Sequence, residues 1–208
     1  MPVFTSHQSP PEWCELREFG IHDVPDGECI EFPPGHARSL FICTAGALEL
    51  LHAGTRIPLA LGVPFELTRA VAVTIKTSGA SQLVRVAGRW TQTSGAGIFT
   101  VRNGPPAAGD PPSFGGKSTP FDNHYHDCDE YWIFLDGSAL VCSEGQTHRV
   151  SPGDCVATGM GWHHDVLRCE RDSGIRAVWF EAALEGRRRP GHLYDSVHGP
   201  AEPQLARV

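Results

Sequence analysis

Residues 124–130 read His124-Tyr125-His126-Asp127-Cys128-Asp129-Glu130, and an apolar run and Gly137 follow them. His124 and His126 are two residues apart, so on an extended strand their side chains point to the same side. Glu130 can return to that side across a bend. The pair His163-His164, later in the chain, can supply a third imidazole. Three imidazoles and one carboxylate suit a divalent first-row transition metal, namely Fe, Mn, Ni, Cu or Zn.

Short apolar runs recur along the chain between 23 glycines and 17 prolines. The runs cover residues 39–43, 47–51, 71–76, 83–86, 131–135, 139–142 and 175–180. Strands of this length with frequent turn signals are typical of an all-β sandwich or barrel. The histidine run is embedded in this pattern, which favours a metal site over a polar surface loop.

The chain contains an internal repeat at an offset of 91 residues, given by 137 − 46, 145 − 54 and 153 − 62. The glycines that match at this offset are Gly46, Gly54 and Gly62 with Gly137, Gly145 and Gly153. The apolar runs beside them match too, and a four-residue insertion then aligns Gly79 with Gly174. Matching glycines and matching flanks together indicate that one fold occurs twice.

The same offset shows where a metal can bind. It places Pro33, Gly35 and Ser39 opposite residues 124, 126 and 130, and Ala72 and Val73 opposite residues 163 and 164. None of these side chains is a metal ligand of the kind required. The first half is therefore predicted to repeat the fold without the site.

Both motifs of the second half resemble those of the cupin superfamily. The first has the form H-x-H, three residues, E, six residues and G, and here it comprises His124, His126, Glu130 and Gly137. In the second, Gly153 is followed by Gly159-Met160-Gly161, then by Trp162-His163-His164. The sequence departs from the family at Ser118, Gly159 and Arg168, where Gly, Pro and Asn are expected.

This resemblance implies an all-β bicupin, with two jelly-roll β-barrels in tandem. We expect a degenerate barrel without metal ligands over residues 1–103, a Pro/Gly-rich linker over 104–117, and a metal-binding barrel with a C-terminal tail over 118–208. Residues 98–101 are expected to form an edge strand. The first barrel's resemblance to the family rests on the repeat alone.

The resemblance also implies a ligand set of His124, His126, Glu130 and one of His163 and His164. Counting from Gly161 favours His164, whereas a Trp-His pairing favours His163, and we prefer His164. The histidine not used, or Asp127 or Asp165, could act as a catalytic base. The default interpretation of Asp127 and Asp129 is a solvated hairpin, and that of Trp132 and Phe134 is barrel core.

Composition limits the classes of partner and compartment. A formal charge of −7, with no basic cluster before residues 187–189, argues against nucleic-acid binding and against adhesion to anionic membranes. We recognise no signal peptide and no apolar span of about 18 residues. Seven cysteines without disulfide spacing read as small buried hydrophobes in a reducing, cytoplasmic setting, with Cys128 set apart by its place in the run. The resemblance allows a homodimer.

Two classes of function follow from the resemblance. The first is a metal-dependent enzyme on a small polar metabolite, either an O2-using dioxygenase or a redox-neutral isomerase, epimerase or lyase. The second is a non-catalytic cupin that binds a sugar or another small ligand as a sensor or store. Turnover without O2 would exclude the dioxygenase.

Overall fold

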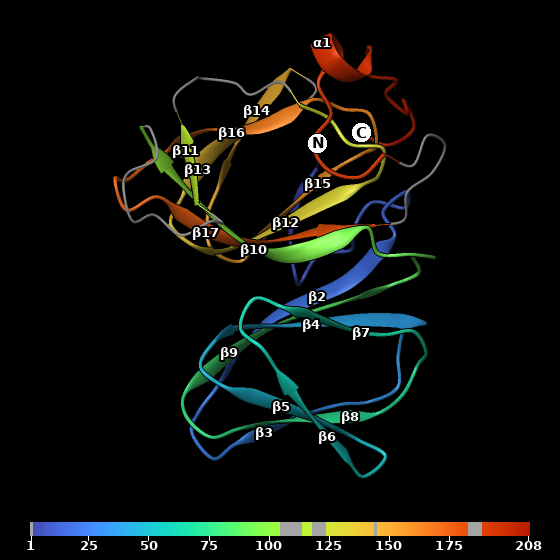
Figure 1. Ribbon diagram of the computed structural model, residues 1–208, viewed down its shortest axis with the longest axis vertical. Helices are drawn as coiled ribbons and strands as arrows, with labels where there is room; N and C mark the ends of the chain where they lie inside the picture. The colour runs from blue at the N-terminus through green and yellow to red at the C-terminus, as the bar shows by residue number, and fades with distance from the viewer. Residues whose placement is uncertain (1, 105–113, 118–123, 144, 183–188) are drawn as a thin grey trace. The chain divides into compact units, whose positions relative to one another are not determined.

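The computed structural model describes residues 2–104, 114–117, 124–143, 145–182 and 189–208, with the side chains of 114–117 excepted. The regular secondary structure of the described residues is almost entirely β-strand, as the sequence predicted (Figure 1). It divides into two compact units, one formed by Glu15–Trp90 and the other by Met1–Cys14 with Thr91–Val208. We call them the first unit and the second unit. No helix of the described residues is long and apolar enough to cross a membrane.

The first unit consists of two antiparallel sheets of four strands each. One sheet has the order β2 (Leu16–Val24), β9 (Ser81–Gly88), β4 (Arg38–Ala45) and β7 (Pro64–Leu67). The other has the order β3 (Cys29–Phe32), β8 (Val73–Thr77), β5 (Leu48–His52) and β6 (Thr55–Leu59). Buried side chains from both sheets, among them Phe41, Leu50 and Ile75, form one hydrophobic cluster. Two sheets packed around one core are the layer arrangement of a jelly roll.

The second unit also has two sheets, of which one has two strands more and the other one strand fewer than in the first unit. Its larger sheet has the order β1 (Val3–Thr5), β15 (Asp154–Thr158), β12 (Glu130–Asp136), β17 (Ile175–Glu181), β10 (Gly95–Asn103) and β11 (Phe114–Lys117). The smaller sheet has the order β14 (Gln146–Val150), β13 (Ala139–Ser143) and β16 (His164–Cys169). A four-residue helix, α1 (Asp195–His198), lies in the tail. Trp132 and Phe134 belong to the core cluster of this unit, so their interpretation as barrel core is confirmed.

The structure supports the repeat and corrects its last step. Strands β5 and β13, and likewise β6 and β14, begin and end at positions 91 residues apart. Gly46 and Gly137 have φ angles of 74° and 73°, a backbone conformation that favours glycine and that explains why both turns contain it. Ile42 pairs with Val84 and Ile133 with Val178, so the final strands are offset by 178 − 84 = 94 residues. The insertion therefore has three residues, and Gly79 is not the partner of Gly174.

The chain divides at places other than the predicted boundaries. Strand β10 pairs with β17 along seven residues, so residues 95–103 belong to the second unit and not to the first. Because β11 pairs with its other side, β10 is not an edge strand, and that prediction was wrong. Strand β1 also joins the second unit by pairing with β15. Within the predicted linker, residues 105–113 lie outside the described part of the chain, and 114–117 form β11.

Candidate metal centre

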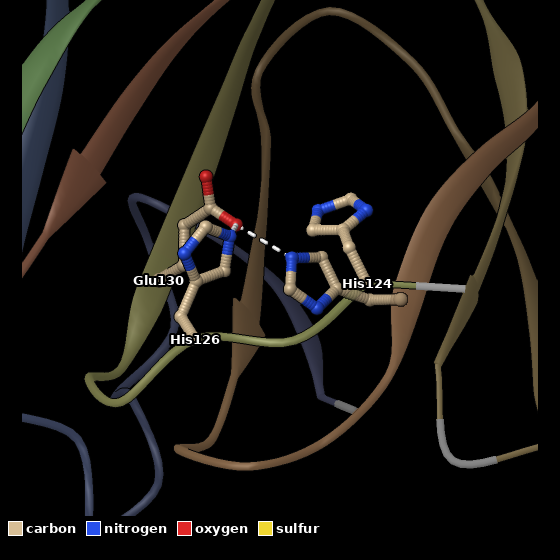
Figure 2. Close-up of side chains that lie close together, drawn as sticks. His124, His126 and Glu130 are labelled. Atoms are coloured by element: carbon tan, nitrogen blue, oxygen red, sulfur yellow. Dashed lines mark hydrogen bonds and ion pairs between the residues drawn. The ribbon is translucent and has the colours of Figure 1, made fainter. Parts of the chain in front are cut away.

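The four predicted ligands come together from three parts of the second unit. His124 forms an isolated β-bridge with His164, the first residue of β16. A bend at residues 127 and 128 then turns the chain, so that Glu130, the first residue of β12, meets the imidazoles. His124, His126, Glu130 and His164 are buried, and each offers a ligand atom within 4.8 Å of those of the others. Figure 2 shows the Glu130 carboxylate turned toward the imidazole rings.

Hydrogen bonds orient two members of this group. Glu130 Oε2 lies 2.6 Å from His164 Nε2 and 3.4 Å from His126 Nε2. The other ring nitrogen of His164, Nδ1, lies 2.9 Å from the carbonyl oxygen of Trp162. A carbonyl can only accept, so Nδ1 carries a proton and Nε2 is the atom that faces the carboxylate. His163 has no place in the group, because its Nε2 lies 3.2 Å from Asp195 Oδ2.

Burial and mutual proximity set the protonation of the group. Burial lowers the pKa of His126 to about 4, although the nearby Glu130 opposes the shift. Burial would raise the pKa of Glu130, but His126 and the hydrogen bond with His164 outweigh it and lower that pKa to about 2. Burial would lower the pKa of His164, and its hydrogen bond with Glu130 raises it instead. Near neutral pH the group therefore contains a carboxylate and a neutral His126, which are the forms that bind metal.

The residues present fit a divalent metal ion. Among the described residues, both ring nitrogens of His126 are buried without a hydrogen bond of good geometry, although the Gly191 backbone and the carboxylates of Glu130 and Glu181 lie beside the ring. Buried polar atoms normally have a partner, so nitrogens in this state indicate a ligand that completes them. Three imidazoles and one carboxylate are a donor set that suits first-row transition metals. The group could hold such an ion, and its donor set does not distinguish Fe, Mn, Ni, Cu and Zn.

A segment of the tail lies beside the centre and carries a histidine that sequence reasoning missed. The ring of exposed His192 stacks on His124 with centroids 4.1 Å apart, and its centroid lies 5.2 Å from that of His126. Leu193 fixes this segment by pairing with the backbone of Tyr125 in both directions, at 3.0 and 2.9 Å. His192 stands in a polar, turn-rich stretch without periodicity, so no sequence pattern marks it.

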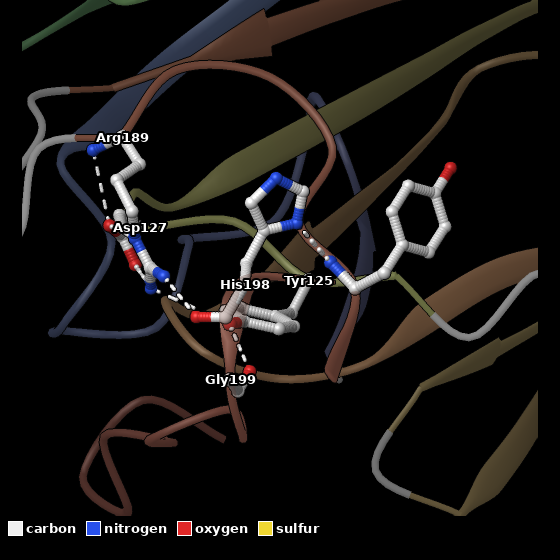
Figure 3. A network of polar contacts seen from close by, with 6 residues as sticks. Tyr125, Asp127, Arg189, His198 and Gly199 are labelled. Atoms are coloured by element: carbon white, nitrogen blue, oxygen red, sulfur yellow. Dashed lines mark hydrogen bonds and ion pairs between the residues drawn. The ribbon is translucent and has the colours of Figure 1, made fainter. Parts of the chain in front are cut away.

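Arg189 and Asp127 anchor the same segment (Figure 3). Arg189 donates from Nε to Asp127 Oδ2 at 2.8 Å and from Nη2 to Oδ1 at 3.0 Å. It also donates to the carbonyl of His198, and the Tyr125 hydroxyl donates to that of Gly199. Asp127 is thus a buried anchor of the tail and not part of a solvated hairpin. Its partner, Arg189, is the last of three consecutive arginines, of which Arg187 and Arg188 lie outside the described residues.

Two further sequence interpretations need correction. Asp129 is fully buried and accepts hydrogen bonds from Arg207 Nη1 at 2.8 Å and from the Met160 amide at 2.9 Å, so it is not solvated either. Of the cysteines read as buried, Cys29 is exposed and Cys142 is partly exposed.

The motif position usually taken by proline is Gly159, where a Cβ atom would meet the Arg207 carbonyl oxygen. The tail therefore explains why this turn contains glycine.

Glu181 is a second residue that sequence reasoning missed. It is the last residue of β17 and pairs in register with Glu130 on β12. Its Oε1 lies 3.5 Å from His126 Nδ1, on the side of the ring opposite to Glu130. The repeat could have drawn attention to it, because a carboxylate ends this strand where the first unit has an apolar residue.

Comparison with known proteins agrees with the fold. No protein-family model matches the chain. It is 37% identical over 215 residues to the uncharacterized protein y4oW of Sinorhizobium fredii, covering 100% of this chain and 97% of that protein. AerE from Microcystis aeruginosa is similar in structure, with a TM-score of 0.59 and 9% identity over 81% of this chain and 90% of that one. Bacillus subtilis oxalate decarboxylase, which has Mn(II) centres, is also similar in structure, with a TM-score of 0.56 and 9% identity. The match covers 92% of this chain and 74% of that one.

Proposed function

We propose that this chain, whose two motifs resemble those of the cupin superfamily and whose fold is similar to that of oxalate decarboxylase, is a metal-dependent enzyme that acts on a small polar metabolite. One observation carries the proposal: three histidines and a carboxylate are buried together and facing one another in the second unit. A purely structural interior would not gather four ionisable side chains, because burying polar groups costs free energy unless each is satisfied. Their burial is accounted for if they hold an ion.

In this proposal His124, His126, Glu130 and His164 hold one divalent transition metal. Such an ion would supply Lewis-acid chemistry, or redox chemistry if the metal is iron, manganese, copper or nickel. Metal binding requires deprotonated ligands, so the proton between Glu130 and His164 must leave on loading. Glu130 is well suited to this exchange because its low pKa keeps the carboxylate ionised.

The residues around the centre narrow the choice of catalytic groups. His163 faces Asp195, and Asp127 is committed to Arg189, so neither of these predicted candidates lies beside the ligands. His192 does, since its exposed ring stacks on His124. We therefore place His192 first among the residues that would contact a substrate or carry a proton for it.

The test is turnover by metal-loaded protein, with and without O2, across sugars, keto acids, thiols and phenols. Turnover that requires O2 would identify a dioxygenase, and turnover under anaerobic conditions would identify an isomerase, epimerase or lyase. The His126→Ala variant is the matched control and is expected to be inactive. If the loaded protein bound a compound of the panel and converted none, the alternative of a non-catalytic cupin would replace the enzyme.

A further inference from the structure

Glu181 is a buried carboxylate that the proposed ligand set does not use. Its side chain is 8% exposed, and its Oε1 lies 3.5 Å from His126 Nδ1. Charge in such a place is unfavourable unless a partner compensates it. The side chains of Ser94 and Cys128 hydrogen-bond the Glu181 carboxylate, so it is held toward His126 by groups of its own unit.

The imidazole ring of His126 lies between two carboxylates. Nε2 faces Glu130 at 3.4 Å, within the cluster of ligand atoms, and Nδ1 faces Glu181. A histidine that binds metal through one nitrogen generally donates its other N–H to a carboxylate, a carbonyl or water, which fixes its tautomer. His164 shows this arrangement already, because its Nδ1 donates to the Trp162 carbonyl.

The first unit supplies an independent observation. Strands β4 and β9 pair Ser39 with Ala87, just as β12 and β17 pair Glu130 with Glu181. The unit without metal ligands therefore lacks both carboxylates and retains the same strand pairing. The fold does not require a carboxylate at this position, so its presence in the second unit needs a reason connected with the cluster.

We propose that Glu181 is a positioning residue for the metal centre: it accepts the Nδ1–H of His126 and so leaves Nε2 for the ion. This inference rests on the proposed metal site. A different role is a second ion bound by His126, Cys128 and Glu181, whose ligand atoms also lie within 4.8 Å of one another. Cys128 hydrogen-bonds the Glu181 carboxylate, and the number of Zn²⁺ ions bound per chain distinguishes the two roles.

The experiment measures Zn²⁺ binding to the full chain by competition with a chelator. Glu181→Ala, which installs the residue of the first unit, is expected to weaken Zn²⁺ binding by roughly 10–100-fold. Glu181→Gln retains an oxygen acceptor without the charge, so its affinity should fall between the two. Asp129→Asn is the matched control, because it removes another buried carboxylate whose partners are Arg207 and Met160; it should bind Zn²⁺ like the wild type.

A spectroscopic readout separates positioning from general loosening. In the Zn²⁺-loaded wild type, ¹⁵N-labelled histidine should show a protonated His126 Nδ1 that exchanges slowly with water. In Glu181→Ala this signal should exchange faster, and Glu181→Gln should restore part of its protection. If Glu181→Ala does not fold, the Gln variant carries both measurements.

Three results would overturn the inference. They are unchanged affinity in both Glu181 variants, an equal loss in Asp129→Asn, and two Zn²⁺ ions per wild-type chain falling to one without Glu181. A wild type that binds no divalent metal would instead remove the proposed function itself. Unchanged affinity in the Glu181 variants would, by contrast, remove only the role of Glu181.

Discussion

The first and second units have the same strand pattern, and they differ in what fills one end of it. At the offset of 91, the positions of His124, His126, Glu130 and His164 in the first unit are occupied by Pro33, Gly35, Ser39 and Val73. Ser39 and Glu130 stand on paired strands of matching register, since Ser39 pairs with Ala87 as Glu130 pairs with Glu181. Backbone geometry is thus preserved where the chemistry is absent.

Arginine occupies the corresponding interior of the first unit. The guanidinium of Arg85 lies 3.5 Å from the Ser39 hydroxyl, 2.6 Å from Glu18 Oε1 and 5.1 Å from the centre of the Phe32 ring. A fixed cation there excludes a second one, because like charges repel strongly in a low-dielectric interior. The first unit has this fold with an apolar interior and one buried arginine, so the fold does not by itself require a cluster of metal ligands.

The largest expected effect is the loss of metal binding when a proposed ligand of the second unit is removed. His126→Ala deletes a ligand, so we expect the affinity for Zn²⁺ to fall by more than the roughly 100-fold that loss of a supporting residue can cost. Ser39→Ala, the control at the position equivalent to Glu130, should leave it unchanged. Metal content per chain, measured after dialysis, compares the two variants with the wild type. Full occupancy in His126→Ala would refute the ligand assignment.

The next effect concerns local stability. An ion at 100 times its dissociation constant stabilises the state that binds it by about 2.7 kcal/mol. Because the proposed ligands belong to the second unit, we expect hydrogen exchange to slow by up to about 100-fold in β12 and β16 on adding Zn²⁺. Exchange in β4 and β8, the equivalent strands of the first unit, should change little. Equal slowing in both units would mean that they unfold together. The two units would then not differ in their stabilisation by Zn²⁺.

Local patterns explain what the sequence could reveal. Glycine turns and apolar runs repeat at one offset because the two units use the same backbone conformations, so the all-β repeat was readable. The group of His124, His126, Glu130 and His164 was readable because its spacing reflects strand alternation and a bend. Strand β10 was misassigned because its partner, β17, lies far along the chain, and strand pairing between distant segments leaves no local mark.

Residues that act through tertiary contacts were missed for the same reason. His192 reaches the centre only because the tail pairs with Tyr125, and Asp127 is buried only because Arg189 meets it. Asp127 and Asp129 look solvated in a sequence rich in charge, but each has an arginine partner more than sixty positions later. No periodicity connects such pairs.

The smallest effect concerns the pH dependence of the metal-free protein, in which His126 and Glu181 act in opposite directions. The pKa of His126 falls from 6.5 to about 4 on folding, because burial disfavours the charged ring. The unfolded chain then binds more protons between these values, so stability is lost as pH falls through this window. Burial and the charge of Glu130 raise the pKa of Glu181 from 4.5 to about 7, so its contribution is present below pH 4.5 and is lost as pH rises to 7.

These contributions nearly cancel in the wild type, and Glu181→Gln removes one of them. We therefore expect the free energy of unfolding of Glu181→Gln to fall by about 2 kcal/mol between pH 7 and pH 5, relative to the wild type. Urea unfolding at pH 7, 6 and 5 measures the difference. Curves that stay parallel would show that Glu181 does not hold a proton across this range.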